Sequence, residues 1–184
     1  MSTRAPIPVV AILIGIIPVS LTLINLSAGG LDMAISITSS AFTDGAMIPK
    51  KHTCDAEDIS PDLKWSGVPK EAKSLALICD DPDAPAGTWV HWVLFNIPAD
   101  VTGLPAGISS EAVLKKGAHH GKNDFRKLGY GGPCPPGGTH RYFFKVYALD
   151  TLLNLESGST KAQIVAAMKG HILAEGQLMG KYKR

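Results

Sequence analysis

The arrangement of apolar and polar residues after residue 31 predicts β-strands separated by sharp turns, with one helix near the end. Each strand is a run of apolar, aromatic or β-branched residues that stops at a proline, glycine or aspartate. The clearest runs are residues 75–79, 89–97 and 140–149. Residues 160–163 form a capping-box pattern that opens a helix, and Gly170 is placed to end it. Residues 171–182 fit either a final strand or a loose tail.

Alternation along the strands predicts which side chains share a face. Because successive side chains of a strand point to opposite sides, we expect His91 to lie with Val93 and Phe95. By the same period, His140 and Tyr142 share a face of the later strand. The run at residues 75–79 has no polar position, which predicts a strand buried on both faces.

The N-terminal segment is directed to a membrane. Residues 7–26 carry no charge and follow Arg4. They form either a secretory signal peptide, cut near the small residues at 27–30, or a retained membrane anchor of about 20 residues. We therefore expect a signal peptide or anchor at 1–30 and one domain at 31–184, placed outside the cytoplasm as a secreted, periplasmic or membrane-anchored protein.

Composition narrows the class of protein. The chain has 184 residues, of which 45% are hydrophobic, and this suffices for one domain with its own core. Its 18 basic and 16 acidic residues give a net charge of +2, so no basic field for nucleic acid is expected. Three cysteines, Cys54, Cys79 and Cys134, allow one disulfide and a free thiol or three thiols, and the sequence leaves this open.

Three residues are placed for chemistry, because each lies at the end of an apolar strand beside a proline or glycine break: Asp81, His91 and His140. In one arrangement the carboxylate orients the imidazoles around an anion, with loop N–H groups of the glycine-rich segment 129–139 assisting. Those amides belong to Gly131, Gly132, Gly137 and Gly138.

Two other arrangements use the same residues. Two histidines and an aspartate match a facial triad for a transition metal. Alternatively, Cys134 is a nucleophile, with His140 as its base and Asp81 as the orienting group. The plain alternative to all three is that each histidine is a hydrogen-bonded structural residue.

A family resemblance emerges from several motifs taken together. Residues 81–85 read DPDAP, 91–98 read HWVLFNIP, 129–136 read GYGGPCPP and 140–142 read HRY, with LKWSGVP at 63–69 and NDF at 123–125 in support. In this order they resemble the phosphatidylethanolamine-binding protein family, and more narrowly its prokaryotic Raf kinase inhibitor-like branch. The resemblance extends from about residue 42 to 182. The chain differs from the branch at Asp62, where a second proline is common, and in its N-terminal apolar segment.

The resemblance implies a mainly β fold of two antiparallel sheets with a short C-terminal helix. It also implies a small pocket at one end that takes phosphate-like or carboxylate anions. The residues expected to form this pocket are Asp81, His91, His140, Tyr142, Gly132, Pro135 and Pro136. The carboxylate of Asp83 either joins them or holds the turn. The bonds preceding Pro82 and Pro85 are candidates for cis geometry.

The expected function is therefore binding rather than catalysis, without a metal or cofactor. The expected ligand is a small anion such as phosphate or a phospholipid headgroup. One alternative is an interaction or inhibitor module that acts on a kinase or protease partner, and another is a Cys134-dependent hydrolase. No nucleic-acid partner is expected, membrane association would come from the N-terminal segment, and the sequence leaves open whether two copies form a homodimer.

Overall fold

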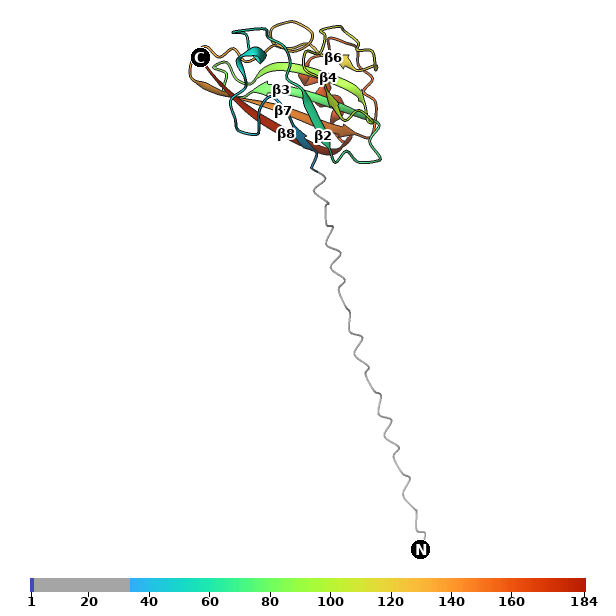
Figure 1. Ribbon diagram of the computed structural model, residues 1–184. Coiled ribbons are helices and arrows are strands. Elements are labelled where there is room, and N and C mark those ends of the chain that lie inside the picture. Colours follow the sequence, from blue (N-terminus) through green and yellow to red (C-terminus); the bar gives the residue numbers. More distant parts are fainter. Residues whose placement is uncertain (2–33) are drawn as a thin grey trace. The chain divides into compact units, whose positions relative to one another are not determined.

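The protein is described here by a computed structural model that covers Met1 and residues 34–184. Antiparallel strands form two sheets, a five-stranded one in the order β6-β4-β3-β7-β8 and a three-stranded one in the order β1-β2-β5 (Figure 1). The strands are β1 Ser36–Thr38, β2 Leu63–Ser66, β3 Ser74–Asp81, β4 Trp89–Pro98, β5 Gly103–Leu104, β6 His119–His120, β7 Thr139–Leu149 and β8 Ile172–Lys183. A 3-10 turn spans Lys50–His52 and the helix α1 spans Lys161–Met168. The expected mainly β fold of two antiparallel sheets with a short late helix is confirmed.

The predicted signal peptide or anchor lies outside the described residues, apart from Met1. Its cleavage and the export of the domain therefore stay predictions. Within residues 34–184, no helix combines the length and the apolar character needed to cross a bilayer.

The central strand β3 organises the core. All eight of its residues are buried, which confirms the prediction for the apolar run at residues 75–79 and extends burial to both ends of the strand. Its side chains enter two hydrophobic clusters on opposite faces. The larger cluster lies between the two sheets, where Leu75 and Leu77 join side chains such as Trp65 of β2. The smaller cluster lies under α1. One strand therefore positions both halves of the domain.

The helix forms as its sequence predicts. Thr160 is the N-cap, with its hydroxyl accepting a hydrogen bond from the Gln163 amide while the Gln163 side chain accepts one from the Thr160 amide. Ile164 and Met168 are the buried residues of α1 and belong to the smaller cluster. The segment after Gly170 is a strand, because β8 pairs with the whole of β7.

The facing of His91 differs from the prediction. Cys79 pairs with Trp92, but its neighbour Asp80 pairs with Val90, so His91 is an extra residue opposite β3. Such a β-bulge breaks the period of two and re-aims the side chain of the extra residue. Val90 consequently packs in the smaller cluster with Val93, and His91 contacts Tyr142 instead of sharing their face.

The turn between β3 and β4 has ordinary peptide geometry. All peptide bonds in the described part of the chain are trans, so the suggestion of cis bonds at Pro82 and Pro85 was wrong. Asp62, where the chain differs from the family pattern, has a structural role. Its carboxylate accepts hydrogen bonds from the Ser39 and Ser40 hydroxyls and from the Ser40 amide, and these bonds hold the segment after β1.

Candidate functional site

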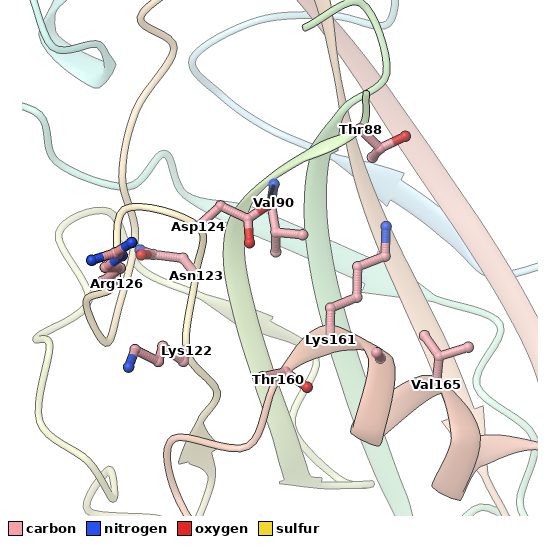
Figure 2. Close-up of a pocket in the computed structure, with 10 residues that line it drawn as sticks. Thr88, Val90, Lys122, Asn123, Asp124, Arg126, Thr160, Lys161 and Val165 are labelled. Atoms are coloured by element: carbon pink, nitrogen blue, oxygen red, sulfur yellow. Dashed lines mark hydrogen bonds between the residues drawn. The ribbon is translucent and has the colours of Figure 1, made fainter. Parts of the chain in front are cut away.

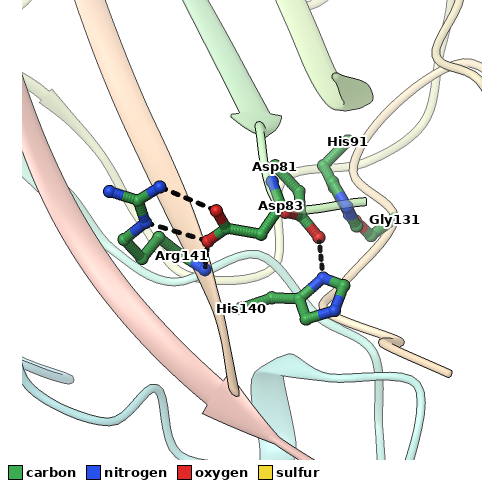
Figure 3. Close-up of polar contacts among 6 residues, drawn as sticks. All are labelled: Asp81, Asp83, His91, Gly131, His140 and Arg141. Atoms are coloured by element: carbon green, nitrogen blue, oxygen red, sulfur yellow. Dashed lines mark hydrogen bonds and ion pairs between the residues drawn. The ribbon is translucent and has the colours of Figure 1, made fainter. Parts of the chain in front are cut away.

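The three residues singled out for chemistry meet at one end of the five-stranded sheet (Figure 3). β3 lies between β4 and β7 and is antiparallel to both. The last residue of β3, Asp81, therefore lies beside the first residues of its two neighbours, and these carry His91 and His140. The topology of the sheet thus builds the site from segments far apart in sequence.

Asp81 and His140 form a buried pair. The Asp81 Oδ2 atom accepts a hydrogen bond from Nδ1 of His140 at 2.7 Å, and only 4% and 9% of the two side chains are exposed. The other carboxylate oxygen accepts the Asp83 amide at 2.8 Å, which caps the turn after β3. Because Nδ1 of His140 is committed to Asp81, only Nε2 of this ring is available to a ligand.

His91 is held in one tautomer. Its Nδ1 donates to the carbonyl oxygen of Gly131 at 2.6 Å, and the Gly131 amide donates back to the His91 carbonyl at 3.0 Å. The ring packs edge-on against Tyr142 and Phe125, with centroids 5.1 and 5.3 Å away. Burial lowers the pKa of His91, although the Gly131 carbonyl and the Asp81 charge oppose this. The ring is therefore neutral near pH 7, and its Nε2 is a hydrogen-bond acceptor.

A small cavity of about 200 Å³ opens beside these groups. The residues that line it are Asp81, Ala84, Pro85, Trp89, His91, Phe125, Cys134, Pro135, Pro136 and His140. Five of the seven predicted pocket residues are among them. Neither lysine nor arginine lines the cavity, so the histidines are its only side chains that can become positively charged. The volume is below the 300–1,000 Å³ range of drug-sized pockets and suits a compact group.

Tyr142 supports the cavity without lining it. Its side chain is fully buried in the larger cluster and packs edge-on against the His91 ring. Its hydroxyl is buried without a hydrogen-bond partner. Burial, and next the Asp81 charge, raise the pKa of the hydroxyl far above its usual value. Tyr142 therefore remains a neutral packing residue.

The glycine-rich loop does not offer the free amides that the sequence suggested. The Gly131 amide bonds to His91, the Gly132 amide to the Asp58 carboxylate at 2.6 Å, and the Gly138 amide to the Arg184 carbonyl. Gly132 also lies outside the cavity lining. Most of these glycine amides thus tie the loop to the protein, and the polar side chains that line the cavity are those of Asp81, His91 and His140.

Gly132 is required for close packing instead. A Cβ atom at this position would lie 2.5 Å from both the His52 carbonyl oxygen and Asp58 Oδ1. We expect Gly132→Ala to lower the free energy of unfolding by about 1–3 kcal/mol, the usual cost of overpacking. Chemical denaturation measures this, with Gly137→Ala as the control because a Cβ there meets nothing within 4 Å. Equal losses in both variants would contradict the assignment.

Cys134 is not a free thiol in this structure. It forms a disulfide with Cys54, while Cys79 is a free thiol buried in the core. A disulfide sulfur has no thiolate to attack a substrate, so the arrangement with Cys134 as a nucleophile was wrong for this state of the protein. The bridge instead ties the wall of the cavity to the segment after the 3-10 turn.

Asp83 holds the turn, the second of the two roles that its sequence position allowed. Its carboxylate accepts bonds from the Arg141 guanidinium at 2.7 and 2.9 Å and from the Arg141 amide (Figure 3). Hydrogen bonding to Arg141 lowers the pKa of Asp83 to about 2, against a weaker opposing effect of burial. Asp83 thus fixes the turn that carries Ala84 and Pro85 to the start of β7.

Sequence reasoning missed the aromatic wall of the cavity. Trp89 and Phe125 pack edge-to-face with centroids 5.5 Å apart, and both line the cavity. Phe125 belongs to the NDF motif at residues 123–125, which was noted in the sequence, but the sequence did not indicate what Phe125 does. Asn123 of the same block donates to the Gly129 carbonyl at 3.1 Å and accepts the Lys127 amide, so it fixes the loop that carries Phe125.

The residues do not assemble as a metal site. Within residues 34–184, no group of three or more His, Cys, Asp or Glu side chains is arranged to hold a metal ion. The two oxygens of Asp81 already accept hydrogen bonds from His140 and Asp83. This geometry matches an orienting carboxylate better than a facial triad.

A larger groove of about 560 Å³ lies between α1 and the loop at residues 122–126 (Figure 2). It contains three basic residues, but Figure 2 shows Lys122 and Arg126 on the opposite side of Asp124 from the amino group of Lys161. Lys161 is moreover bound to the buried Asp80 at 2.5 Å. The positive charges do not converge, so the smaller cavity with its histidines is the better candidate site.

Comparisons with known proteins agree with this architecture. The family model for phosphatidylethanolamine-binding protein matches residues 38–183. A UPF0098 protein of Methanothermobacter thermautotrophicus is 55% identical over 150 residues, which cover 82% of this chain and 99% of the relative. A UPF0098 protein of Pyrococcus horikoshii is 44% identical, covering 96% of this chain and 92% of the relative.

Solved structures give the same result. A putative phosphatidylethanolamine-binding protein homologue from Chlamydia trachomatis is 44% identical with a TM-score of 0.76, covering 83% of this chain and 99% of its own. Escherichia coli YbcL, described as a member of the mammalian family, is 36% identical with a TM-score of 0.75, covering 82% of this chain and 98% of its own. With the family model matching most of the domain, this chain belongs to the phosphatidylethanolamine-binding protein family.

Proposed function

We propose that this protein binds a small phosphate-like or carboxylate anion in the cavity between His91 and His140, without catalysing a reaction. The observation that carries the proposal is the paired orientation of the two imidazoles. Each ring has its Nδ1 committed to a protein oxygen, and each lines the same cavity, so the two Nε2 atoms are the groups left for a ligand. Two histidines and one carboxylate held this way form a receptor rather than a nucleophile with its base.

The two rings have different roles in this receptor. A doubly protonated His140 donates its Nε2–H to the anion, and the Asp81 carboxylate beside it balances the ring's charge. A neutral His91 can only accept at Nε2, so it suits a ligand that carries both an oxyanion and a hydroxyl. Protonated forms of phosphate and phosphate monoesters have both groups, whereas sulfate and phosphodiesters lack the hydroxyl.

The family name supports a phosphate ligand, since phosphatidylethanolamine carries a phosphate in its headgroup. The donor and acceptor pattern favours a monoester over the diester of an intact phospholipid. A phospholipid headgroup and a phosphorylated side chain of a partner protein both carry a phosphate group, but only the phosphorylated side chain is a monoester. This connects the anion receptor with the alternative of an interaction module.

The location of the domain outside the cytoplasm remains part of the proposal. It rests on the apolar segment at residues 7–26 and is supported by the Cys54–Cys134 disulfide, because such bridges persist mainly in oxidising compartments. Fractionation of cells that produce the full chain, with N-terminal sequencing of the product, tests both export and cleavage.

Titration with inorganic phosphate and with sulfate, from pH 8 to pH 5, tests the receptor. Donation from Nε2 of His140 requires that ring to be protonated, because its Nδ1 is committed to Asp81, so both affinities should rise as the pH falls, by up to about tenfold per pH unit for the one proton taken up. At a given pH, phosphate should bind about 3–10-fold more tightly than sulfate, the value of one hydrogen bond to His91. NMR shifts of the His91 and His140 resonances report the site directly.

The matched control is His171→Ala, because His171 also bonds an aspartate through Nδ1 at 2.7 Å but on the surface. His140→Ala should abolish the pH-dependent binding, and His171→Ala should leave it unchanged. Affinities that do not vary with pH, or a loss that is equal in the two variants, would overturn the proposal. Tighter binding of glycerophosphoethanolamine than of phosphoethanolamine would assign the site to a diester headgroup.

A further inference from the structure

A third cavity, far from His91 and His140, opens directly into the larger hydrophobic cluster. It has a volume of about 530 Å³, within the range of small-molecule sites. The floor consists of buried residues of the larger cluster, and the walls are partly buried apolar side chains of the segment after β5. The floor residues are Ile97, Val101, Leu104 and Ala118, and the walls include Ile108 and Leu114. We call this cavity the apolar slot.

The apolar slot is separate from the proposed anion receptor. Trp89, at the start of β4, lines the receptor, whereas Ile97 and Pro98, at the end of the same strand, line the slot. A strand rises about 3.3 Å per residue, so these two ends of β4 are about 25–30 Å apart. A ligand in the apolar slot would therefore not touch a ligand in the proposed anion receptor.

The rim of the apolar slot is charged. Lys115 and Lys116 line it and are exposed, and neither forms an ion pair with any residue of the described chain. Glu111 also lines the rim, so the three charges sum to +1. An apolar floor beside two unpaired ammonium groups is complementary to a molecule with a hydrocarbon chain and an anionic end.

A polypeptide fits these features less well. The adjacent strand β5 has only two residues, Gly103 and Leu104, so an added strand would gain very few backbone hydrogen bonds. The slot offers apolar side chains instead of a long exposed strand edge. We propose that the apolar slot binds a single-chain anionic amphiphile, with the chain over Leu104 and Ala118 and the anionic group at Lys115 and Lys116.

The test uses the full chain and three probes that share one hydrocarbon chain, each below its micelle concentration: dodecanoate, dodecanol and dodecyltrimethylammonium. Binding is followed by displacement of an environment-sensitive fluorescent fatty acid and by NMR shifts of the Leu104 and Ala118 amides. Dodecanoate should bind most tightly and the cationic probe most weakly. Decanoate should bind about tenfold more weakly than dodecanoate, because each buried methylene contributes about 0.8 kcal/mol.

Two pairs of variants locate the site. Ile108→Glu places a charge in the wall and should weaken dodecanoate binding at least tenfold, whereas Ile172→Glu, at a residue 43% exposed outside the slot, should not. Lys115→Glu with Lys116→Glu should remove the preference for dodecanoate over dodecanol. Lys50→Glu with Lys51→Glu, an exposed pair outside the slot, is the charge-matched control and should keep the preference.

The outcomes distinguish binding in the apolar slot from binding elsewhere on the protein. Saturable binding that Ile108→Glu weakens and Ile172→Glu does not supports the proposal, and thermal melting of both variants verifies that they are folded. No saturable binding of dodecanoate, or equal affinity for the three probes, would overturn it. Loss of dodecanoate binding in His140→Ala would show that dodecanoate binds in the anion receptor and not in the apolar slot. Failure of phosphate to bind the receptor would leave the proposal for the apolar slot unaffected.

Discussion

Replacing Asp81 by asparagine should weaken phosphate binding near pH 6 by about 10–150-fold while the domain remains folded. The substitution removes the negative charge that balances a protonated His140 at 2.7 Å, so the ring loses its support for donating from Nε2. Hydrogen bonds to charged groups contribute about 1.5–3 kcal/mol, which corresponds to a loss of about 10–150-fold in affinity. Calorimetric titration with phosphate measures it.

The protein contains its own control for this experiment. Asp150 forms the same contact with His171, also at 2.7 Å, but about half of each side chain is exposed. Exposed pairs contribute little, so Asp150→Asn should change neither phosphate affinity nor, by more than about 0.5 kcal/mol, stability. Full retention of phosphate binding in Asp81→Asn would show that the carboxylate is a structural cap of the turn and no part of a receptor.

Removing the disulfide should produce the largest loss of stability among the changes considered. Cys54 and Cys134 are separated by 80 positions, and a crosslink over such a loop is worth about 4 kcal/mol in the chain-entropy model. For a domain of this size the melting temperature should fall by about 8–16 °C. The variant is the double change Cys54→Ser with Cys134→Ser, compared with the oxidised protein by calorimetry.

Reductant supplies the control. It should lower the melting temperature of the natural chain toward that of the double variant and leave the double variant unchanged, because Cys79 is a buried thiol with nothing to reduce. Burial, followed by the charges of Asp80 and Asp81, raises the pKa of Cys79, so this thiol is also slow to react. Identical melting temperatures with and without the bridge would refute its structural role.

Local sequence was a good guide to the strands and a poor guide to the facing of one key residue. The long runs at β3, β4 and β7 are specified by their own composition, and so they were predicted nearly to their ends. The bulge at His91 depends on how Asp80 and Cys79 pair across the sheet, which no window of β4 alone contains. Alternation therefore assigned His91 to the wrong face.

In the candidate site, too, some features could be predicted from local sequence and others depend on contacts between distant segments. Asp81, His91 and His140 were recognisable because each ends an apolar run beside a turn, and the sheet brings them together. The partners of the loop amides were not recognisable, since the Gly132 amide bonds to Asp58, which lies 74 positions earlier. The disulfide pairing was equally hidden in a chain with three cysteines. Contacts of this range are set by the whole fold.

The bulge at His91 has a consequence for protein engineering. The position of His91 is set by its pairing opposite β3, whereas Ala84 and Pro85, which line the cavity mouth, belong to the turn before β4. Loop length and histidine placement are therefore separable design variables. On the anion-binding function proposed above, a library that varies the length and composition of residues 84–88 should resize the entrance for bulkier anions while both imidazoles keep their places, so this domain could be developed into sensors for different anions.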